Sequence, residues 1–163
     1  MVVGNLPTRV RPFWKEFCTA CATSPSETSY EVFYFGDTES VANELAKLVL
    51  EGIKRATASL LWRYEFENHP LPEAGNLSVM TNWDGIPLCV IQTMNVEILP
   101  FQAVPAEFAR IEGEGDKTLE YWRDVHWRFF ASECAQIGKT ASPEMPVVCE
   151  QFSVVYQPGG NAA

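Results

Sequence analysis

The chain has 163 residues, of which 47% are hydrophobic, 12% aromatic and 20% charged, and its formal net charge is -9. At roughly 150 residues per domain, this length corresponds to a single domain, which can build a core without metal or disulfide support. The excess of acidic residues excludes a surface that attracts phosphates over its whole extent. We therefore expect any contact with nucleic acid to be local and dependent on salt.

The sequence has no apolar stretch of about 18 residues, the length that a membrane-spanning helix needs. Its first residues, MVVGNLPTRVRPFW, lack the charged-then-apolar order of a signal peptide, so we expect a soluble cytoplasmic protein with no membrane partner. The five cysteines are an odd number, which favours reduced thiols over a disulfide framework. Cys18 and Cys21 form a CxxC pair without two further ligands at matching spacing, so we expect no metal site.

An N-terminal helical extension, residues 1–29, is expected to precede the main domain, residues 30–158, and a disordered tail, residues 159–163. In the extension, apolar residues recur every three or four positions over residues 7–22, which predicts an amphipathic helix. The run EVFYF at residues 31–35 is rich in aromatic residues and predicts the first strand.

A second helix is expected to begin at Asp37 or Thr38, since either side chain can cap it, and to end at Gly52. The following segment, IKRATASLLWRYEFE at residues 53–67, is expected to be a turn that leads into a short helix. A proline-rich loop, HPLPEAG, then breaks any periodic pattern.

Residues 77–82 and 87–99 are rich in β-branched and apolar residues and are joined through Asp84 and Gly85, which predicts a β-hairpin. A short helix is expected within residues 100–111, a longer one over residues 118–135, and a final strand over residues 146–157. The residues expected on the buried face of the longer helix are Leu119, Trp122, His126 and Phe129. Strands and helices do not alternate regularly, so we predict an α+β fold with a small curved or barrel-like sheet and flanking helices.

The segment GIKRATAS, residues 52–59, concentrates basic and hydroxyl side chains where a helix ends. A lysine desolvated in a cleft can act as a base, and a hydroxyl three residues later can lie within its reach across a turn. The alternative is a solvated helix end, where Lys54 and Arg55 favour the negative pole of the helix dipole.

Two blocks of the sequence, FYFGDTESVANELAKLVLEGIKRATASLLW and EGEGDKTLEYWRDVHWRFF, closely resemble the ASCH-domain family, in particular its bacterial branch that carries both blocks. The resemblance covers roughly residues 31–157 and leaves the N-terminal helix unexplained. It implies a PUA-like β-barrel with flanking helices. It also implies a cleft lined by a GxKxxT motif, formed here by Gly52, Lys54 and Thr57.

Members of this family are thought to bind RNA, and some resemble ribonucleases or amidohydrolases that remove acyl groups from the exocyclic amine of cytidine. The resemblance implies a lysine proton acceptor, a threonine nucleophile and a glutamate proton donor. We expect no cofactor. These roles fall on Lys54, Thr57 and a glutamate of the EGEGD turn, either Glu112 or Glu114. We prefer Glu114 because it lies nearer to the following helix.

The two reactions need different charge states of the same groups. For deacylation, Lys54 must be neutral to take the proton of Thr57, and a protonated carboxylic acid must supply the leaving amine. The crowded carboxylates of the EGEGD turn are expected to raise one another's pKa, which favours such an acid. For RNA cleavage, Lys54 and Arg55 would stay charged, and Glu114 would accept the proton of the 2′-hydroxyl.

Aromatic and basic residues that follow Lys54 are candidates for stacking bases and holding phosphates. The residues expected to bind substrate are Arg55, Ser59, Arg63, Glu112, Trp62, Trp83 and Tyr64. For at least one of the aromatic residues the alternative is packing in the core, and Ser59 can instead cap a helix. His126 is interpreted as a hydrogen-bonded core histidine rather than an acid or base.

Our first prediction is ribonuclease-type cleavage of single-stranded RNA without a metal, so that activity persists in a chelator. The alternatives are an amidohydrolase acting on N4-acylcytidine nucleosides and an RNA-binding module without catalysis. A third alternative is a vestigial cleft in a homodimer assembled through the N-terminal helix.

Overall fold

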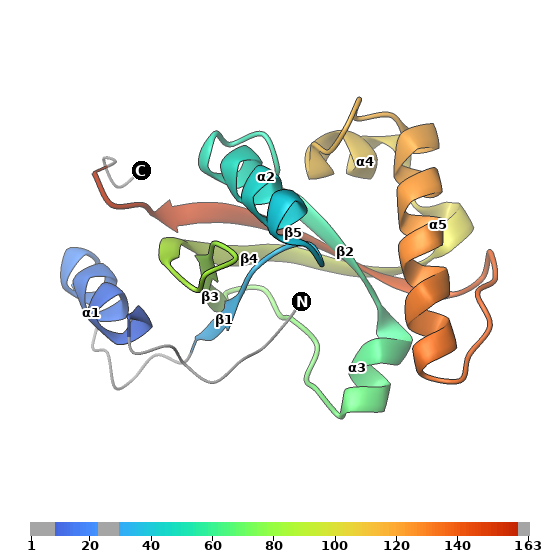
Figure 1. The fold of residues 1–163 in the computed structure, drawn as a ribbon, viewed down its shortest axis with the longest axis horizontal. Helices are drawn as coiled ribbons and strands as arrows, with labels where there is room; N and C mark the ends of the chain where they lie inside the picture. The colour runs from blue at the N-terminus through green and yellow to red at the C-terminus, as the bar shows by residue number, and fades with distance from the viewer. Residues whose placement is uncertain (1–8, 23–29, 160–163) are drawn as a thin grey trace. The chain divides into compact units, whose positions relative to one another are not determined.

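A computed structural model describes residues 9–22 and 30–159 of the chain (Figure 1). Its elements, in chain order, are α1 (Val10–Ala20), β1 (Glu31–Phe33), α2 (Glu39–Leu50), β2 (Ala56–Leu60), α3 (Leu61–Glu67), β3 (Leu77–Thr81), β4 (Pro87–Pro100), the short 3-10 helix η1 (Phe101–Ala103), α4 (Ala106–Glu112), α5 (Leu119–Gln136) and β5 (Pro146–Tyr156). No helix in the described part of the chain combines the length and apolar character needed to cross a bilayer.

The five strands hydrogen-bond in the order β1-β3-β4-β5-β2. Strand β1 is parallel to β3, whereas the pairs β3–β4 and β2–β5 are antiparallel. The predicted hairpin is confirmed as β3 and β4, in register from Leu77 opposite Gln92. Its turn is closed by hydrogen bonds between Asn82 and Ile86, and Gly85 adopts the positive φ of 74° that favours glycine.

The chain divides into two compact units, each with its own core. The first contains the described residues up to Gly52, Gly75–Thr93 and the described residues from Phe152 onward. The second contains Ile53–Ala74 and Met94–Gln151. Strands β4 and β5 each contribute residues to both units.

In the first unit, helix α1 presents an apolar face to the strands. The buried residues of this cluster are Val10, Phe13, Trp14, Phe17 and Cys18 of α1 with Val32, Val79 and Val90 of the strands. The Trp14 ring also stacks on Tyr30, with ring centroids 4.0 Å apart. The predicted amphipathic helix is thus confirmed over its described residues.

Helix α2 begins and ends where its sequence signals predict. The hydroxyl of Thr38 accepts a hydrogen bond from the Val41 amide at 3.4 Å, so Thr38 rather than Asp37 is the cap. Gly52 follows the last helical turn with a φ of 72°, as expected for a C-terminal glycine.

In the second unit, residues 56–60 form strand β2, so the prediction of a turn in this part of residues 53–67 is wrong. The strand exists because every residue from Ala56 to Leu60 is in register with β5, from Gln151 to Val147. Because the pairing strand lies about ninety residues further along the chain, the alanine-rich segment itself carries no sequence pattern that indicates a strand. The short helix predicted after it is confirmed as α3.

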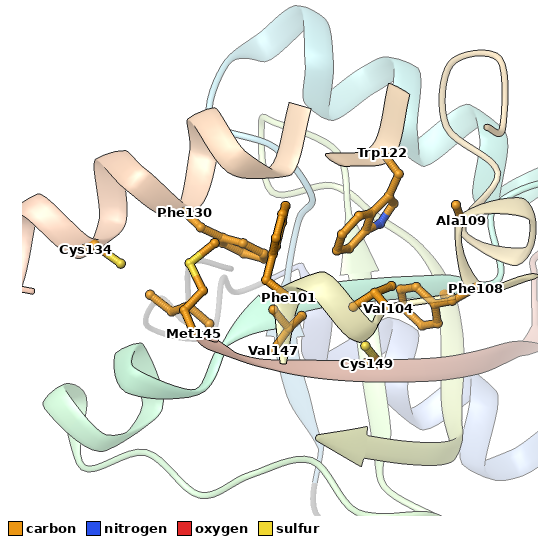
Figure 2. Close-up of a cluster of buried hydrophobic side chains, with 12 residues drawn as sticks. Phe101, Val104, Phe108, Ala109, Trp122, Phe130, Cys134, Met145, Val147 and Cys149 are labelled. Carbon is orange, nitrogen blue, oxygen red and sulfur yellow. The ribbon is translucent and has the colours of Figure 1, made fainter. Parts of the chain in front are cut away.

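The core of the second unit lies along α5, β2 and β5 and includes η1 and α4 (Figure 2). Helix α5 contributes a row of side chains spaced four residues apart, namely Trp122, His126, Phe130 and Cys134. Phe130 is fully buried, whereas Phe129 is 39% exposed. Placing Phe129 on the buried face was therefore wrong, because spacings of three and four residues fit a helix equally well and only the core distinguishes them.

This difference predicts unequal effects of truncating the two neighbouring phenylalanines. Phe130→Ala should lower the free energy of unfolding by about 3–5 kcal/mol, because it leaves a cavity in the core. Phe129→Ala, the matched control, should lower it by less than about 1 kcal/mol. Urea unfolding followed by circular dichroism measures both, and equal losses would contradict this assignment of the buried face.

Candidate functional site

A close approach of two backbone segments creates the site. The segment that precedes β2 lies against the turn between α4 and α5, where the Arg55 amide donates a hydrogen bond to the Ile111 carbonyl at 3.0 Å. Gly113 has a φ of 77°, and a Cβ atom at this position would lie only 2.4 Å from the Ile53 oxygen. Glycine is therefore required here both by backbone conformation and by space, and it lets the end of α4 and the turn after it bring Glu112 and Glu114 to Lys54.

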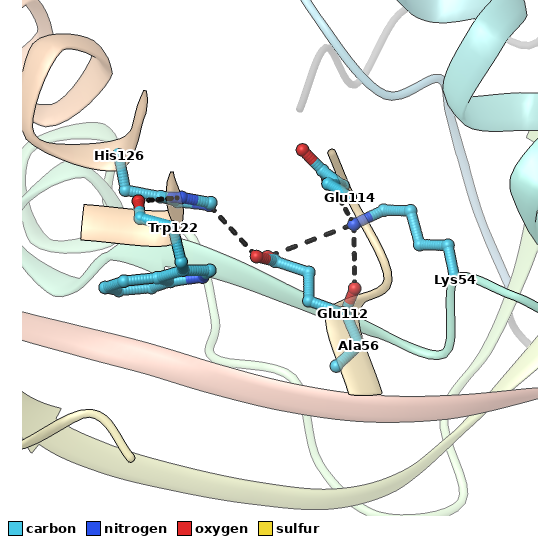
Figure 3. Close-up of polar contacts among 6 residues, drawn as sticks. All are labelled: Lys54, Ala56, Glu112, Glu114, Trp122 and His126. Atoms are coloured by element: carbon cyan, nitrogen blue, oxygen red, sulfur yellow. Dashed lines mark hydrogen bonds and ion pairs between the residues drawn. The ribbon is translucent and has the colours of Figure 1, made fainter. Parts of the chain in front are cut away.

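Lys54 is 1% exposed, and its Nζ atom faces oxygen atoms (Figure 3). Nζ donates hydrogen bonds to the Ala56 carbonyl at 2.8 Å and to Glu114 Oε1 at 2.6 Å. Glu112 Oε1 lies 3.9 Å from the same nitrogen. Two carboxylates and a carbonyl around one amine form the environment of an ammonium ion, because a buried charge needs partners.

Behind Lys54, Glu112 also meets a histidine. Glu112 Oε2 lies 3.3 Å from His126 Nε2, and His126 Nδ1 lies 2.9 Å from the Trp122 carbonyl oxygen. A carbonyl oxygen only accepts hydrogen bonds, so Nδ1 is the donor. The imidazole ring also stacks on the Trp122 indole, with centroids 4.3 Å apart (Figure 3).

The charges of this cluster support one another. Burial raises the pKa of Glu112, but the charges of Lys54 and His126 outweigh burial and hold that pKa below its usual range. Burial lowers the pKa of His126, but Glu112 and, more weakly, Glu114 outweigh it and raise that pKa above its usual value. The expectation that crowding raises the carboxylate pKa is thus wrong for Glu112, because the charges of Lys54 and His126 lower that pKa.

Solvent reaches this cluster mainly through one of its members. The side chain of Glu114 is 19% exposed, whereas those of Lys54 and Glu112 are each 1% exposed. A substrate that approaches from solvent therefore meets the Glu114 carboxylate. Both glutamates that the sequence left as alternatives contact Lys54, Glu114 from the solvent side and Glu112 from the core side.

The other residues predicted around Lys54 lie outside the cluster of ion pairs. Ala56 and Leu60 of β2 are buried in the core, so the alternating residues Thr57 and Ser59 belong to the opposite face, where both are half-buried. Thr57 is in register with Glu150 of β5. Arg55 is exposed.

The predicted stacking residues differ in how far each ring is buried and in what each ring contacts. Tyr64 is 8% exposed, which fits the alternative of core packing. Trp62 is half-buried against the core, and Lys139 Nζ lies 5.0 Å from its ring centroid. Trp83 belongs to the first unit and packs edge-on against Tyr34 at 5.2 Å.

Arg63, the remaining predicted substrate ligand, has partners of its own in the second unit. Its Nε atom forms an ion pair with Glu67 at 2.6 Å, and Nη1 lies 3.4 Å from Gln136 Oε1. Within residues 9–22 and 30–159, no three His, Cys, Asp or Glu side chains are grouped to hold a metal ion. All five cysteines are free thiols.

His126 is the member of the cluster that the sequence did not identify. Its interpretation as a buried, hydrogen-bonded histidine is confirmed, but its ion pair with Glu112 was not foreseen. The available signal was a histidine four residues after Trp122 on an apolar helix face. That spacing does not indicate which residue of another element the ring meets.

The role of Gly113 can be tested with a matched glycine that has a similar φ. Gly138 has a φ of 72° and open space where a Cβ would lie, so Gly138→Ala should lower the free energy of unfolding by about 1–2 kcal/mol through strain alone. Gly113→Ala should lower it by about 1–3 kcal/mol more, because the Cβ collides with backbone. Equal losses in urea unfolding would contradict the importance of the close approach.

The ion pair of Glu112 and His126 predicts a pH dependence of stability. Because the pKa of His126 is raised above 6.5 in the fold, its contribution is complete below pH 6.5 and is lost as pH rises through the folded pKa. Because the pKa of Glu112 is lowered below 4.5, its contribution is complete above pH 4.5 and is lost as pH falls through the folded pKa.

Urea unfolding at a series of pH values measures this dependence. The free energy of unfolding of the wild type should fall above pH 6.5 relative to that of His126→Gln, which has no imidazole to titrate. His69→Gln, at the only other histidine, serves as the control and should follow the wild type. A constant difference between wild type and His126→Gln from pH 6.5 to 9 would contradict the assignment.

Comparison with known proteins supports a common fold. An ASCH domain from Lactobacillus crispatus JV V101 has a TM-score of 0.86 and 35% identity, over 96% of this chain and 100% of that chain. A protein from Enterococcus faecalis V583 has a TM-score of 0.82 and 36% identity, over 90% of this chain and 88% of that chain. No curated protein matches this chain significantly. The predicted α+β, PUA-like fold class is confirmed by the first of these structures.

The ASCH domain model matches residues 31–156, a range that contains Lys54, both glutamates and His126. Helix α1 precedes the matched residues. The predicted resemblance is thus confirmed over most of the sequence. The chain belongs to the ASCH-domain family, whose PUA-like members generally bind RNA.

Proposed function

We propose that this ASCH domain cleaves single-stranded RNA, with Glu114 as the proton acceptor and Lys54 as the adjacent positive charge. The observation that carries the proposal is the contact of 2.6 Å between Lys54 Nζ and Glu114 Oε1. In this contact a carboxylate lies beside an amine, and the carboxylate is 19% exposed to solvent whereas the amine side chain is 1% exposed. A base and a cation side by side suit the transfer of a phosphoryl group.

The reaction proceeds within the RNA strand. Glu114 accepts the proton of a 2′-hydroxyl, and the 2′-oxygen attacks the neighbouring phosphorus. The bond from phosphorus to the 5′-oxygen breaks, that oxygen takes a proton from water, and the products are a 2′,3′-cyclic phosphate and a free 5′-hydroxyl. Lys54 stabilises the negative charge that develops, and the exposed Arg55 binds a phosphate of the strand.

The second candidate function is deacylation of an N4-acylcytidine, which the net charge of -9 favours because a nucleoside carries no phosphate. This reaction needs a neutral Lys54 close to the hydroxyl of Thr57. In the structure Lys54 is paired with two carboxylates, and Thr57 is not a member of the cluster. RNA cleavage needs neither change, so we place it first.

The test compares wild type with Glu114→Gln and Lys54→Met, in EDTA, on a short single-stranded RNA and separately on N4-acetylcytidine. The wild type should release fragments that end in a 2′,3′-cyclic phosphate, detected by mass spectrometry. Glu114→Gln should reduce the rate by about 10²–10⁴-fold, because it removes the general base. Glu120→Gln is the matched control, since it removes an exposed carboxylate on the first turn of α5 and should retain activity.

A strand of the same sequence with 2′-deoxyribose should remain intact, because it lacks the attacking hydroxyl. Free cytidine from N4-acetylcytidine, without RNA fragments, would replace the proposal with the deacylation reaction. RNA binding without any product from either substrate would leave a binding module. Loss of all turnover in EDTA would overturn the reaction without a metal.

A further inference from the structure

The glutamate on the core side of Lys54 is shared between two cations. Its Oε1 atom lies 3.9 Å from Lys54 Nζ, and its Oε2 atom lies 3.3 Å from His126 Nε2. His126 is fixed in turn by the Trp122 carbonyl at 2.9 Å and by stacking on the Trp122 ring. A continuous series of contacts therefore joins α5 to Glu114 through His126, Glu112 and Lys54 (Figure 3).

Packing alone does not account for this pair. Glu112 and His126 are both buried in the second unit, next to a core of apolar side chains that includes Trp122 and Phe130. A buried ion pair is costly to desolvate, and apolar residues of similar volume often stabilise a fold as well or better. An ion pair at this position therefore indicates that its charges have a role beyond packing. Lys54 is the charged group that this pair contacts, through Glu112.

We propose that His126 is a positioning residue, which acts through Glu112 to hold the Lys54 ammonium in place beside Glu114. For the chemistry at Glu114 this inference rests on the proposed function, but the coupling of His126 to Lys54 does not. In this proposal His126 acts through Glu112 and not by contact with the substrate. Its charge binds the far oxygen of Glu112, so that the near oxygen supports Lys54 without replacing Glu114 as its closest partner.

The groups that face the His126 ring come from several elements. They are Glu112 of α4, Glu114 of the turn before α5, and Lys54 beyond Glu112. The Cys149 thiol of β5 also interacts electrostatically with Glu112. Burial raises the pKa of Cys149 to about 12, so this thiol stays neutral. When His126 loses its proton, Glu112 retains Lys54 as its remaining cation. The Lys54 environment is therefore expected to change in the pH range where His126 titrates.

The test observes Lys54 directly by NMR. The Lys54 Nζ resonance is identified by its absence in Lys54→Met, and the two histidines are followed through their Cε1 signals, which His69→Gln distinguishes. In the wild type, the Lys54 signal should shift with the same midpoint pH as the His126 signal. In His126→Gln, which keeps a hydrogen-bond donor without a charge that titrates, this shift should be lost. In His69→Gln, it should remain.

A purely structural role for His126 predicts a different result. His126→Gln would then lower the unfolding temperature and leave the position and pH course of the Lys54 signal unchanged, which would overturn the proposal. If His126→Gln fails to fold, the wild-type titration decides alone. Different midpoints for Lys54 and His126 would overturn the proposal just as directly.

The activity measurement separates this inference from the proposed function. If the wild type cleaves RNA, His126→Gln should lose the alkaline limb of the kcat profile with little change in KM, and His69→Gln should keep it. If the wild type shows no RNA cleavage, and the Lys54 signal still follows that of His126, the proposed function fails and the positioning stands. If RNA is cleaved and neither the Lys54 signal nor the kcat profile changes in His126→Gln, the positioning fails alone.

Discussion

A charged amine inside a protein must be surrounded by groups that compensate its lost hydration, and Lys54 imposes this constraint on the second unit. Its carboxylate partners are Glu112, the last residue of α4, and Glu114 in the turn that follows, which approaches closely because Gly113 has no side chain. Because one partner, Glu112, is itself buried, it needs a second cation, and His126 of α5 supplies it. Burial of one charged lysine therefore requires the close turn, the buried glutamate and the stacked histidine together.

The sequence predicted well those elements whose signals are local. The cap at Thr38, the glycine after α2 and the turn at Asp84 and Gly85 each depend on neighbouring residues alone, and each is present in the structure. Strand β2 was missed because it depends on a partner about ninety residues further along the chain. The choice between Phe129 and Phe130 was wrong because helical spacing allows both, and only the packed core selects one.

For the site, the residues of the GxKxxT and EGEGD blocks indicated Lys54 and two candidate glutamates, but not their division of roles. Whether a glutamate lies on the solvent side or the core side depends on the direction of a turn around Gly113, which two alternating acidic residues do not specify. His126 is separated from Glu112 by the whole α4–α5 turn and the start of a helix. Its partner could be recognised only once those elements were placed together.

The ion-pair cluster also affects the electric field of the domain at long range. Two cations and two carboxylates, packed within a few ångströms, cancel as a net charge and leave only a short-range field. The formal net charge of -9 counts histidine as neutral and includes -1 from Lys54, Glu112 and Glu114, so -8 belongs to side chains outside the cluster. In the proposed function, a strand of RNA that approaches through salt water would respond to those exposed charges, Arg55 among them, and not to the buried lysine. In the proposed reaction, attraction toward the site and chemistry within it thus depend on different residues, and the surface can vary in charge without disturbing the buried pairs.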